Sequence, residues 1–133
     1  MALGLLDGSF TKSENMDILR FELPYPPSIN HYYVHTARGV KLGDKGQSYR
    51  RDAFYLLTPY RGKCQDKKLA VTINVFPPDK RKRDIDNILK CLLDAMEHAG
   101  VYENDNNIDM LTVIRRHNVP NGAVQIWICE CDG

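Results

Sequence analysis

Hydrophobic and polar positions alternate in two stretches of the chain, and both stretches predict β-strands. Residues 19–23 and residues 69–76 place an apolar side chain at every second position. Alternation with a period of two gives a strand one apolar face and one more polar face. Prolines follow each stretch, at 24–27 and at 77–78, and proline ends a strand because it lacks a backbone donor. The chain therefore contains two strands that each lead into a proline-rich loop.

Two other stretches show the spacing of a helix. The first covers about residues 44–58 and ends before Pro59. The second begins at Asp84, runs to about Ala99 and is followed by Gly100, a residue type that favours the C-terminal end of a helix. Its apolar residues recur every three or four positions, which predicts one buried face. These residues are Ile85, Ile88, Leu89, Leu92, Met96 and Ala99.

The remaining pattern completes an α+β fold. Two further strands are predicted near residues 111–117 and 123–131, and Asn121-Gly122 between them predicts a hairpin. Residues 28–46, which are rich in polar and aromatic side chains, are interpreted as a loop. The resulting order is β-α-β-α-β-β. It favours a single small domain in which two helices pack on a small mixed sheet.

Length and composition agree with one domain. Of the 133 residues, 43% are hydrophobic, which suffices for one core and leaves little for a second. Residues 17–133 are assigned to this domain, and residues 1–16 are interpreted as a disordered N-terminal extension or tag. The sequence has no apolar run long enough to cross a bilayer, and its four cysteines form no C-x-x-C pair. We therefore expect no membrane contact and a cytoplasmic location.

Charge is distributed unevenly along the chain. The net charge is only +1, yet residues 61–83 carry a net charge of +6 and residues 84–109 a net charge of −6. Basic residues attract phosphates, whereas an acidic block can bind a cation. Neighbouring blocks of opposite sign can also form surface salt bridges, so the distribution by itself leaves both interpretations open.

Two carboxylates stand at the point where the charge changes sign. Asp84 and Asp86 directly follow the basic run Lys80–Arg83. Carboxylate oxygens are ligands for hard divalent cations such as Mg²⁺, and a metal ion beside a bound phosphate can support phosphodiester cleavage. The alternative is that one aspartate only caps the helix. A further acid, Asp105, follows that helix, which at about fifteen residues would be roughly 22 Å long. The loop must fold back for Asp105 to join the pair.

Two other features have both a structural and a functional interpretation. Lys90 lies four residues after Asp86, so it can form an ordinary salt bridge on the helix surface or stabilise charge on a phosphate in the transition state. Asp94, four residues further on, can orient Lys90 or be a plain surface acid. The early loop contains Tyr32 and Tyr33, which can belong to the core or to a dimer contact, or can stack on unpaired bases.

Four segments of the sequence resemble the RusA family of Holliday junction resolvases. They are Pro24–Tyr33, Pro78–Lys90 with its D-x-D-N-x-x-K block, Leu93-Asp-Ala, and Ala99–Asp105. The resemblance extends over nearly the whole domain. It implies a homodimeric endonuclease that uses Mg²⁺ (or Mn²⁺) to resolve four-way DNA junctions by paired symmetric nicks in recombination and repair. It also implies products that carry 5′ phosphates, and an origin in a phage, a prophage or a host genome.

The resemblance assigns roles to individual residues. It implies that Asp84, Asp86 and Asp105 are the catalytic metal ligands and that Lys90 is the essential lysine. The chain departs from the family where some members have two adjacent acids, because Asn104 stands before Asp105. This departure keeps the second acid and lowers the local charge. DNA contacts are expected from the basic run and the early loop, namely from Lys80, Arg81, Lys82, Arg83, Asn30 and Tyr32.

Two alternatives from other classes of protein remain at this point. One is a catalytically silent module that binds DNA junctions without cutting them. The other is a structural protein whose acids only cap a helix and form salt bridges. The presence of Asp84, Asp86, Lys90 and Asp105 together argues against the silent module, and a metal-dependent nicking assay separates all three possibilities.

Overall fold

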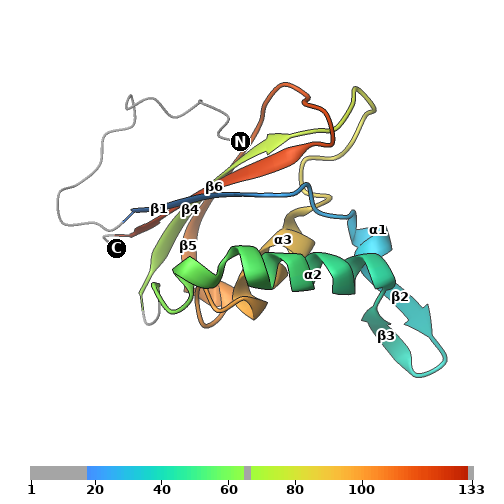
Figure 1. Cartoon of the computed structure of the whole chain (residues 1–133), viewed down its shortest axis with the longest axis horizontal. Helices are drawn as coiled ribbons and strands as arrows, with labels where there is room; N and C mark the ends of the chain where they lie inside the picture. Colours follow the sequence, from blue (N-terminus) through green and yellow to red (C-terminus); the bar gives the residue numbers. More distant parts are fainter. Residues whose placement is uncertain (1–17, 65–66, 132–133) are drawn as a thin grey trace.

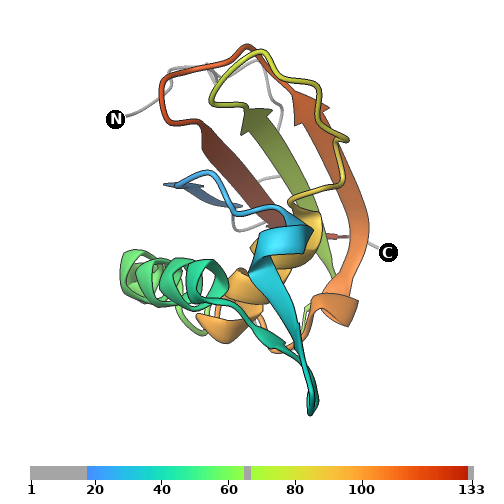
Figure 2. The ribbon, with the colours of Figure 1, turned by 90° about the vertical axis from the view of Figure 1, so that its right-hand side faces the viewer.

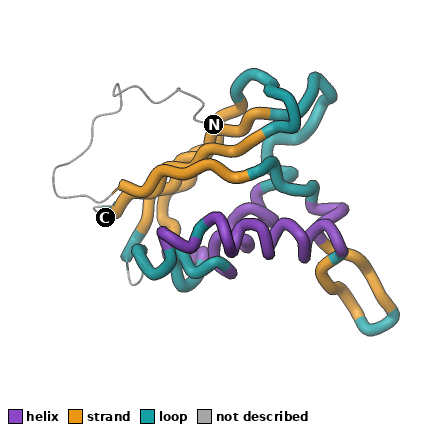
Figure 3. Tube along the Cα trace, viewed as in Figure 1, coloured by secondary structure: helices purple, strands orange, loops and turns teal. Residues whose placement is uncertain are grey.

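The computed structural model describes residues 18–64 and 67–131, and the predicted extension 1–16 lies outside the described residues. A four-stranded sheet forms one layer, and two longer helices cover one of its faces (Figures 1 and 3). The strands are β1 (Ile18–Leu23), β2 (Tyr33–Thr36), β3 (Gly39–Leu42), β4 (Leu69–Phe76), β5 (Ile108–Arg115) and β6 (Ala123–Glu130). The helices are α1 (Ile29–Tyr32), α2 (Asp44–Leu56) and α3 (Leu89–His98), with short 3₁₀ turns η1 (Thr58–Tyr60) and η2 (Asp105–Asn107).

The main sheet is mixed, and its strand order is β1-β6-β4-β5. β6 pairs antiparallel with both β1 and β4, whereas β4 and β5 run parallel. Parallel neighbours need a connection that returns the chain to the same end of the sheet, and α3 supplies this crossover. The predicted α+β class with a small mixed sheet is therefore confirmed. The carboxyl ends of β4 and β5 therefore lie side by side at the same end of the sheet.

The predicted hairpin between the last two strands is wrong. β5 and β6 are not paired, because β4 lies between them. β4 is the most deeply buried strand of the sheet together with β6, so it takes a central position and each of its edges accepts one strand. Asn121 and Gly122 do form a tight turn, with φ angles of 67° and 68°. That turn carries the chain past the end of β4 instead of joining neighbouring strands.

The core lies between the sheet and the two longer helices. α2 contributes Tyr49, Ala53 and Leu57, the last at its C-terminal end, and α3 contributes most of the apolar face predicted for it. Of the positions on that predicted face, Ile85 is 41% exposed. Ile85 is exposed because it precedes the first turn of α3. In the part of the chain that the structure describes, every helix is too short or too polar to span a bilayer.

The segment interpreted as a loop, residues 28–46, contains regular structure. It forms the single turn of α1, the hairpin β2–β3 and the start of α2. Each strand of the hairpin has four residues, and the two pair antiparallel from Tyr33↔Leu42 to Thr36↔Gly39. The hairpin projects away from the helices and the sheet (Figures 1 and 2). Short strands whose residues are mostly exposed carry no alternating pattern, which explains why the pattern of apolar residues did not predict them.

Gly46 allows α1 to pack closely on α2, and its replacement should destabilise the fold. A Cβ atom at Gly46 would lie 2.5 Å from the backbone oxygen of Tyr32. Replacing glycine by alanine inside a helix normally gains about 1 kcal/mol, but overpacking against backbone typically costs about 1–3 kcal/mol. We therefore expect Gly46→Ala to lower the free energy of unfolding, measured by urea denaturation. Asp52→Ala on the exposed side of α2 is the control and should not lower it, and an equally stable Gly46→Ala would contradict the close packing.

Candidate metal and nucleic-acid site

The two central carboxylates lie in a turn that precedes α3, not in the helix itself. Asn87 N–H donates to the Asp84 carbonyl oxygen at 3.1 Å, and Leu89 N–H donates to the Asp86 carbonyl oxygen at 3.1 Å. The predicted helix start at Asp84 is therefore wrong by five residues, because α3 begins at Leu89. Ile88 at the end of the turn is buried in the core and fixes it, whereas the side chains of Asp84 and Asp86 are exposed. We call residues 84–88 the carboxylate turn.

The helix-capping alternative is not supported. Ile88 occupies the N-cap position of α3, and the helix has no side-chain capping hydrogen bond at that end. No ion pair joins Asp86 to Lys90 in the described part of the chain. Neither structural role proposed for these acids therefore accounts for them. Two exposed carboxylates close together in sequence have the donor chemistry that a hard divalent cation requires.

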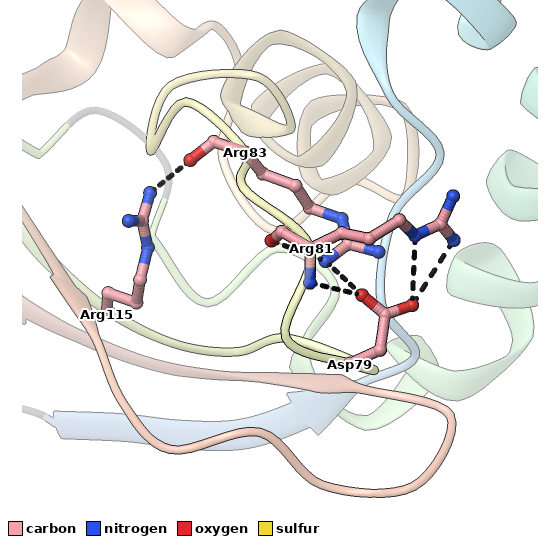
Figure 4. Close-up of polar contacts among 4 residues, drawn as sticks. All are labelled: Asp79, Arg81, Arg83 and Arg115. Carbon is pink, nitrogen blue, oxygen red and sulfur yellow. Dashed lines mark hydrogen bonds and ion pairs between the residues drawn. The ribbon is translucent and has the colours of Figure 1, made fainter.

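The basic run before the carboxylate turn is organised by one acid, Asp79. Its Oδ2 atom accepts from the Arg81 guanidinium at 3.2 Å, and its Oδ1 atom accepts from the Arg81 backbone N–H at 2.9 Å and pairs with Arg83 Nη1 at 2.8 Å (Figure 4). Hydrogen bonds from Arg83 and then Arg81 hold the pKa of Asp79 well below its usual range, so it stays charged at neutral pH. The side chain of Arg83 is only 19% exposed, whereas that of Arg81 is 79% exposed. Arg81 is the better placed of the two to meet a phosphate.

The end of β5 forms a second basic wall, which the sequence interpretation missed. Arg115 donates from Nη2 to the Arg83 carbonyl oxygen at 2.5 Å (Figure 4). Arg116 N–H donates to the Val75 oxygen of β4 at 2.8 Å, which holds the two carboxyl ends together. Arg115 and Arg116 add positive charge near Asp84, and His117 lines the same cavity. Their link to the site follows from the parallel pairing of β4 and β5, and strand order could not be read from the sequence.

Two cavities flank the basic loop. One of about 350 Å³ lies between this loop and the end of β5, and Asp84 lines it with Arg115. The other, of about 360 Å³, lies on the opposite side, where Ser28, His31 and Lys45 face the loop. Both are lined largely by cationic and polar side chains. Concave surfaces of one charge sign attract ligands of the opposite sign, so both can accept phosphate groups.

Lys90 lies in the first turn of α3 and is exposed. One turn further on, Asp94 accepts from Arg50 Nη2 at 2.5 Å and from the Tyr32 hydroxyl at 2.7 Å. Burial opposes the charged form of Asp94, but these hydrogen bonds and the nearby Lys90 outweigh it, so the pKa of Asp94 lies below its usual range. Asp94 is therefore a charged anchor for α1 and α2, and it lies close to Lys90.

The side chain of Tyr32 is not accessible to DNA in this structure, so the DNA contact predicted for it finds no support here. Its side chain is fully buried, and its hydroxyl is bonded to Asp94. Burial, and then the hydrogen bond to Asp94, raise the pKa of Tyr32, so the hydroxyl remains a donor. Asn30 is exposed in α1. The N–H of Ile29 donates to the Asn87 oxygen at 3.1 Å, which places α1 against the carboxylate turn and leaves Asn30 available to a ligand.

Asp105 is not gathered with the two central carboxylates. Its backbone N–H donates to Glu97 Oε1 at 2.8 Å, near the C-terminal end of α3. The carboxylate turn precedes the opposite end of this ten-residue helix, which is about 15 Å long. Among the described residues, no group of three or more acidic, histidine or cysteine side chains is close enough to hold a metal ion. The predicted fold-back that joins Asp105 to Asp84 and Asp86 is not found within one chain.

Fold and site together define a class of small α+β protein with a cationic surface at one end of its sheet and a pair of exposed carboxylates beside it. Residues 24–128 match the family model described as Endodeoxyribonuclease RusA. The crossover junction endodeoxyribonuclease of Enterobacteria phage HK97 is 40% identical over 118 residues, which cover 88% of this chain and 98% of that protein. Proteins with the same description from Enterobacteria phage 82 and Escherichia coli K12 are each 29% identical over 119 residues, covering 86% of this chain and 97% of theirs. The chain therefore belongs to the RusA family of endodeoxyribonucleases.

Proposed function

We propose that this protein is a metal-dependent endonuclease that resolves four-way DNA junctions by paired symmetric nicks, in recombination and repair. The observation that carries the proposal is the exposed carboxylate turn at the carboxyl ends of β4 and β5, beside two cationic cavities. The names of the relatives as crossover junction endodeoxyribonucleases support the same substrate. With DNA as its substrate, the protein would act in the cytoplasm of a bacterial host.

Asp84 and Asp86 would hold the metal ion, since their carboxylates are exposed and serve neither as helix caps nor in ion pairs within the described residues. All-oxygen ligands suit Mg²⁺, and they also accept Mn²⁺. When bound, such a cation lowers the pKa of a coordinated water and neutralises charge on the phosphate. We retain Asp105 as a third ligand on the strength of the family resemblance. It can reach the pair through a rearrangement of its loop or through a second copy of the chain, since one chain does not gather the three.

Lys90 would stabilise negative charge on the reacting phosphate. It lies in the first turn of α3, immediately after the carboxylate turn, and its side chain is exposed. A cation fixed where charge develops lowers the barrier to reaction more than it strengthens binding of the ground state. Asp94 remains paired with Arg50 and Tyr32, so Lys90 can turn toward a phosphate without leaving Asp94 unpartnered.

The DNA backbone would be bound by the basic run, which consists of Lys80, Arg81, Lys82 and Arg83. Asn30 would extend this contact across α1. Such contacts position the DNA and carry no sequence information. Arg83 acts in part through Asp79, which holds it in place. Cutting two strands at symmetric positions requires two equivalent sites, and a two-fold homodimer supplies one to each strand.

A second candidate is a junction-binding module without catalysis. One observation favours it, namely that no three-acid metal group forms within the described part of a single chain. Such a module would keep the basic loop and the cavities and would bind junctions without nicking them. This candidate predicts that the unmodified protein does not cleave junctions, so a substitution of Asp86 would have no cleavage rate to lower.

Substrate preference provides the test of binding. Two sites in a symmetric dimer can both engage only DNA that presents two phosphates related by two-fold symmetry. We expect a four-way junction to bind at least about ten times more tightly than duplex of the same length, a difference of about 1.4 kcal/mol. Competition binding at one fixed salt concentration, with Ca²⁺ in place of the catalytic metal, measures it. Equal affinity for junction and duplex would argue against a resolvase.

A further inference from the structure

The hairpin β2–β3 contributes little to the core of the protein. Residues 34–41 are all exposed, and only Tyr33 and Leu42 at its base are partly buried. A two-stranded hairpin that stands alone is marginally stable in water. This hairpin therefore depends on its base for its position, and nearly all of its surface is available to a partner. Four residues per strand give it a reach of roughly 13 Å.

The base of the hairpin is fixed firmly to the two longer helices. Gly43 N–H donates to the Tyr32 oxygen at 2.9 Å, and Gln47 Nε2 of α2 donates to the Leu42 oxygen at 3.2 Å. Tyr32 itself is buried and donates to Asp94 of α3, one turn after Lys90. The hairpin is thus held in a defined direction relative to the start of α3.

The charge of this segment has one sign. Residues 24–43 contain no aspartate or glutamate, whereas Arg38 occupies the turn of the hairpin and Lys41 lies on β3. Both are exposed, and neither takes part in an ion pair within the described residues. The first acid after the hairpin is Asp44 at the start of α2. Two exposed cations on a projecting element that carries no acid of its own favour a polyanionic partner over an ordinary protein surface.

The hairpin and the basic loop lie on either side of the carboxylate turn. Figure 2 faces this side of the molecule, with the loop after β4 at the top, α1 in the middle and the hairpin at the bottom. The hydrogen bond from Ile29 N–H to the Asn87 oxygen places α1 against the carboxylate turn. A DNA backbone cut at Asp84 and Asp86 therefore has cationic surface available in both directions.

We propose that hairpin β2–β3 is a second DNA-binding element, which contacts phosphates of the branched substrate through Arg38 and Lys41. The inference rests on the proposed function and adds a contact region to it. The other partner to consider is a second copy of the chain, since Val34 and Val40 are exposed apolar residues of the hairpin. Charge favours DNA, because two hairpins meeting across a two-fold axis would bring like charges together.

The salt dependence of junction binding tests the proposal. Each phosphate contact that is lost makes the slope of log K against log salt less steep by about 1. The double variant Arg38→Gln/Lys41→Gln should therefore bind a four-way junction more weakly, with a slope less steep by about 2. The control variant Arg51→Gln/Lys63→Gln removes the same charge from α2 and the loop after it, and it should keep the slope of the unmodified protein.

The same experiment distinguishes failure of the hairpin contact from failure of the proposed function. Equal slopes for the hairpin variant and the unmodified protein would overturn the inference. Analytical ultracentrifugation measures the oligomeric state of both proteins, and a changed oligomeric state with an unaltered slope would also overturn it. Unlabelled duplex is added as a competitor to the unmodified protein in parallel. If the junction is not preferred there, the proposed function fails, whereas the slopes still report whether the hairpin contacts phosphates.

Discussion

Asp86→Asn is expected to lower the rate of junction cleavage by about 10²-fold or more, taking a catalytic metal as worth several kcal/mol. The substitution removes a charged oxygen ligand and keeps the size of the side chain. Asp86 is exposed and makes no helix cap, so the fold should be unaffected. The basic loop is also untouched, and junction binding should persist.

A quenched time course of cleavage at saturating protein measures this effect. Asp52→Asn is the matched control, because Asp52 is an exposed acid on α2, outside the site. It should cut at the rate of the unmodified protein. If Asp86→Asn also cut at that rate, the carboxylate turn could not be the catalytic centre, and the assignment of Asp84 would fall with it.

Lys90→Ala is expected to slow the chemical step by roughly 10²-fold, the size typical of removing one group that stabilises charge in the transition state. Junction affinity should change little, because a contact that forms mainly in the transition state affects turnover more than binding. The side chain is exposed and is joined to Asp86 by no ion pair, so truncating it should not destabilise the fold.

Single-turnover cleavage separates these effects when it is measured together with the dissociation constant. Lys63→Ala removes an exposed lysine from the loop after α2 and serves as the control, with no change expected in the rate at saturation. Weaker binding of Lys90→Ala with an unchanged rate at saturation would make Lys90 a simple phosphate anchor.

The core of this fold follows from local patterns in the sequence. The alternation in residues 69–76 predicts β4 with its bounds, and the helical spacing after Ile88 identifies the face of α3 that is buried. Both signals are set by nearby residues. Strand order is not, because the position of β4 between β5 and β6 depends on pairing between segments far apart in the chain. The Asn121-Gly122 sequence therefore correctly predicts that the chain reverses direction there. It wrongly predicts that the strands on either side of the turn, β5 and β6, pair with each other.

The site likewise combines features that the local sequence reveals with features that depend on pairing between distant segments. The D-x-D motif and the basic run before it identify the two carboxylates, although the sequence places them at a helix start and the structure places them in a turn. The second wall at Arg115 depends on the parallel pairing of β4 and β5. Tyr32 lies in a polar, aromatic segment, which suggests exposure, yet its partner Asp94 lies 62 residues away. No local pattern reports such a contact. Sequence motifs thus locate the chemistry, and the fold decides which other residues reach it.

The most direct test of the central claim is the position of cuts in a synthetic four-way junction. Each of the four strands carries a 5′ label in turn, and the products are separated on denaturing gels after reaction in Mg²⁺ or in EDTA. We predict paired nicks at symmetry-related positions of two opposing strands, few nicks in linear duplex of the same length, and none in EDTA. Nicks that persist in EDTA, or that are scattered equally along linear duplex, would contradict the proposal of a metal-dependent junction resolvase.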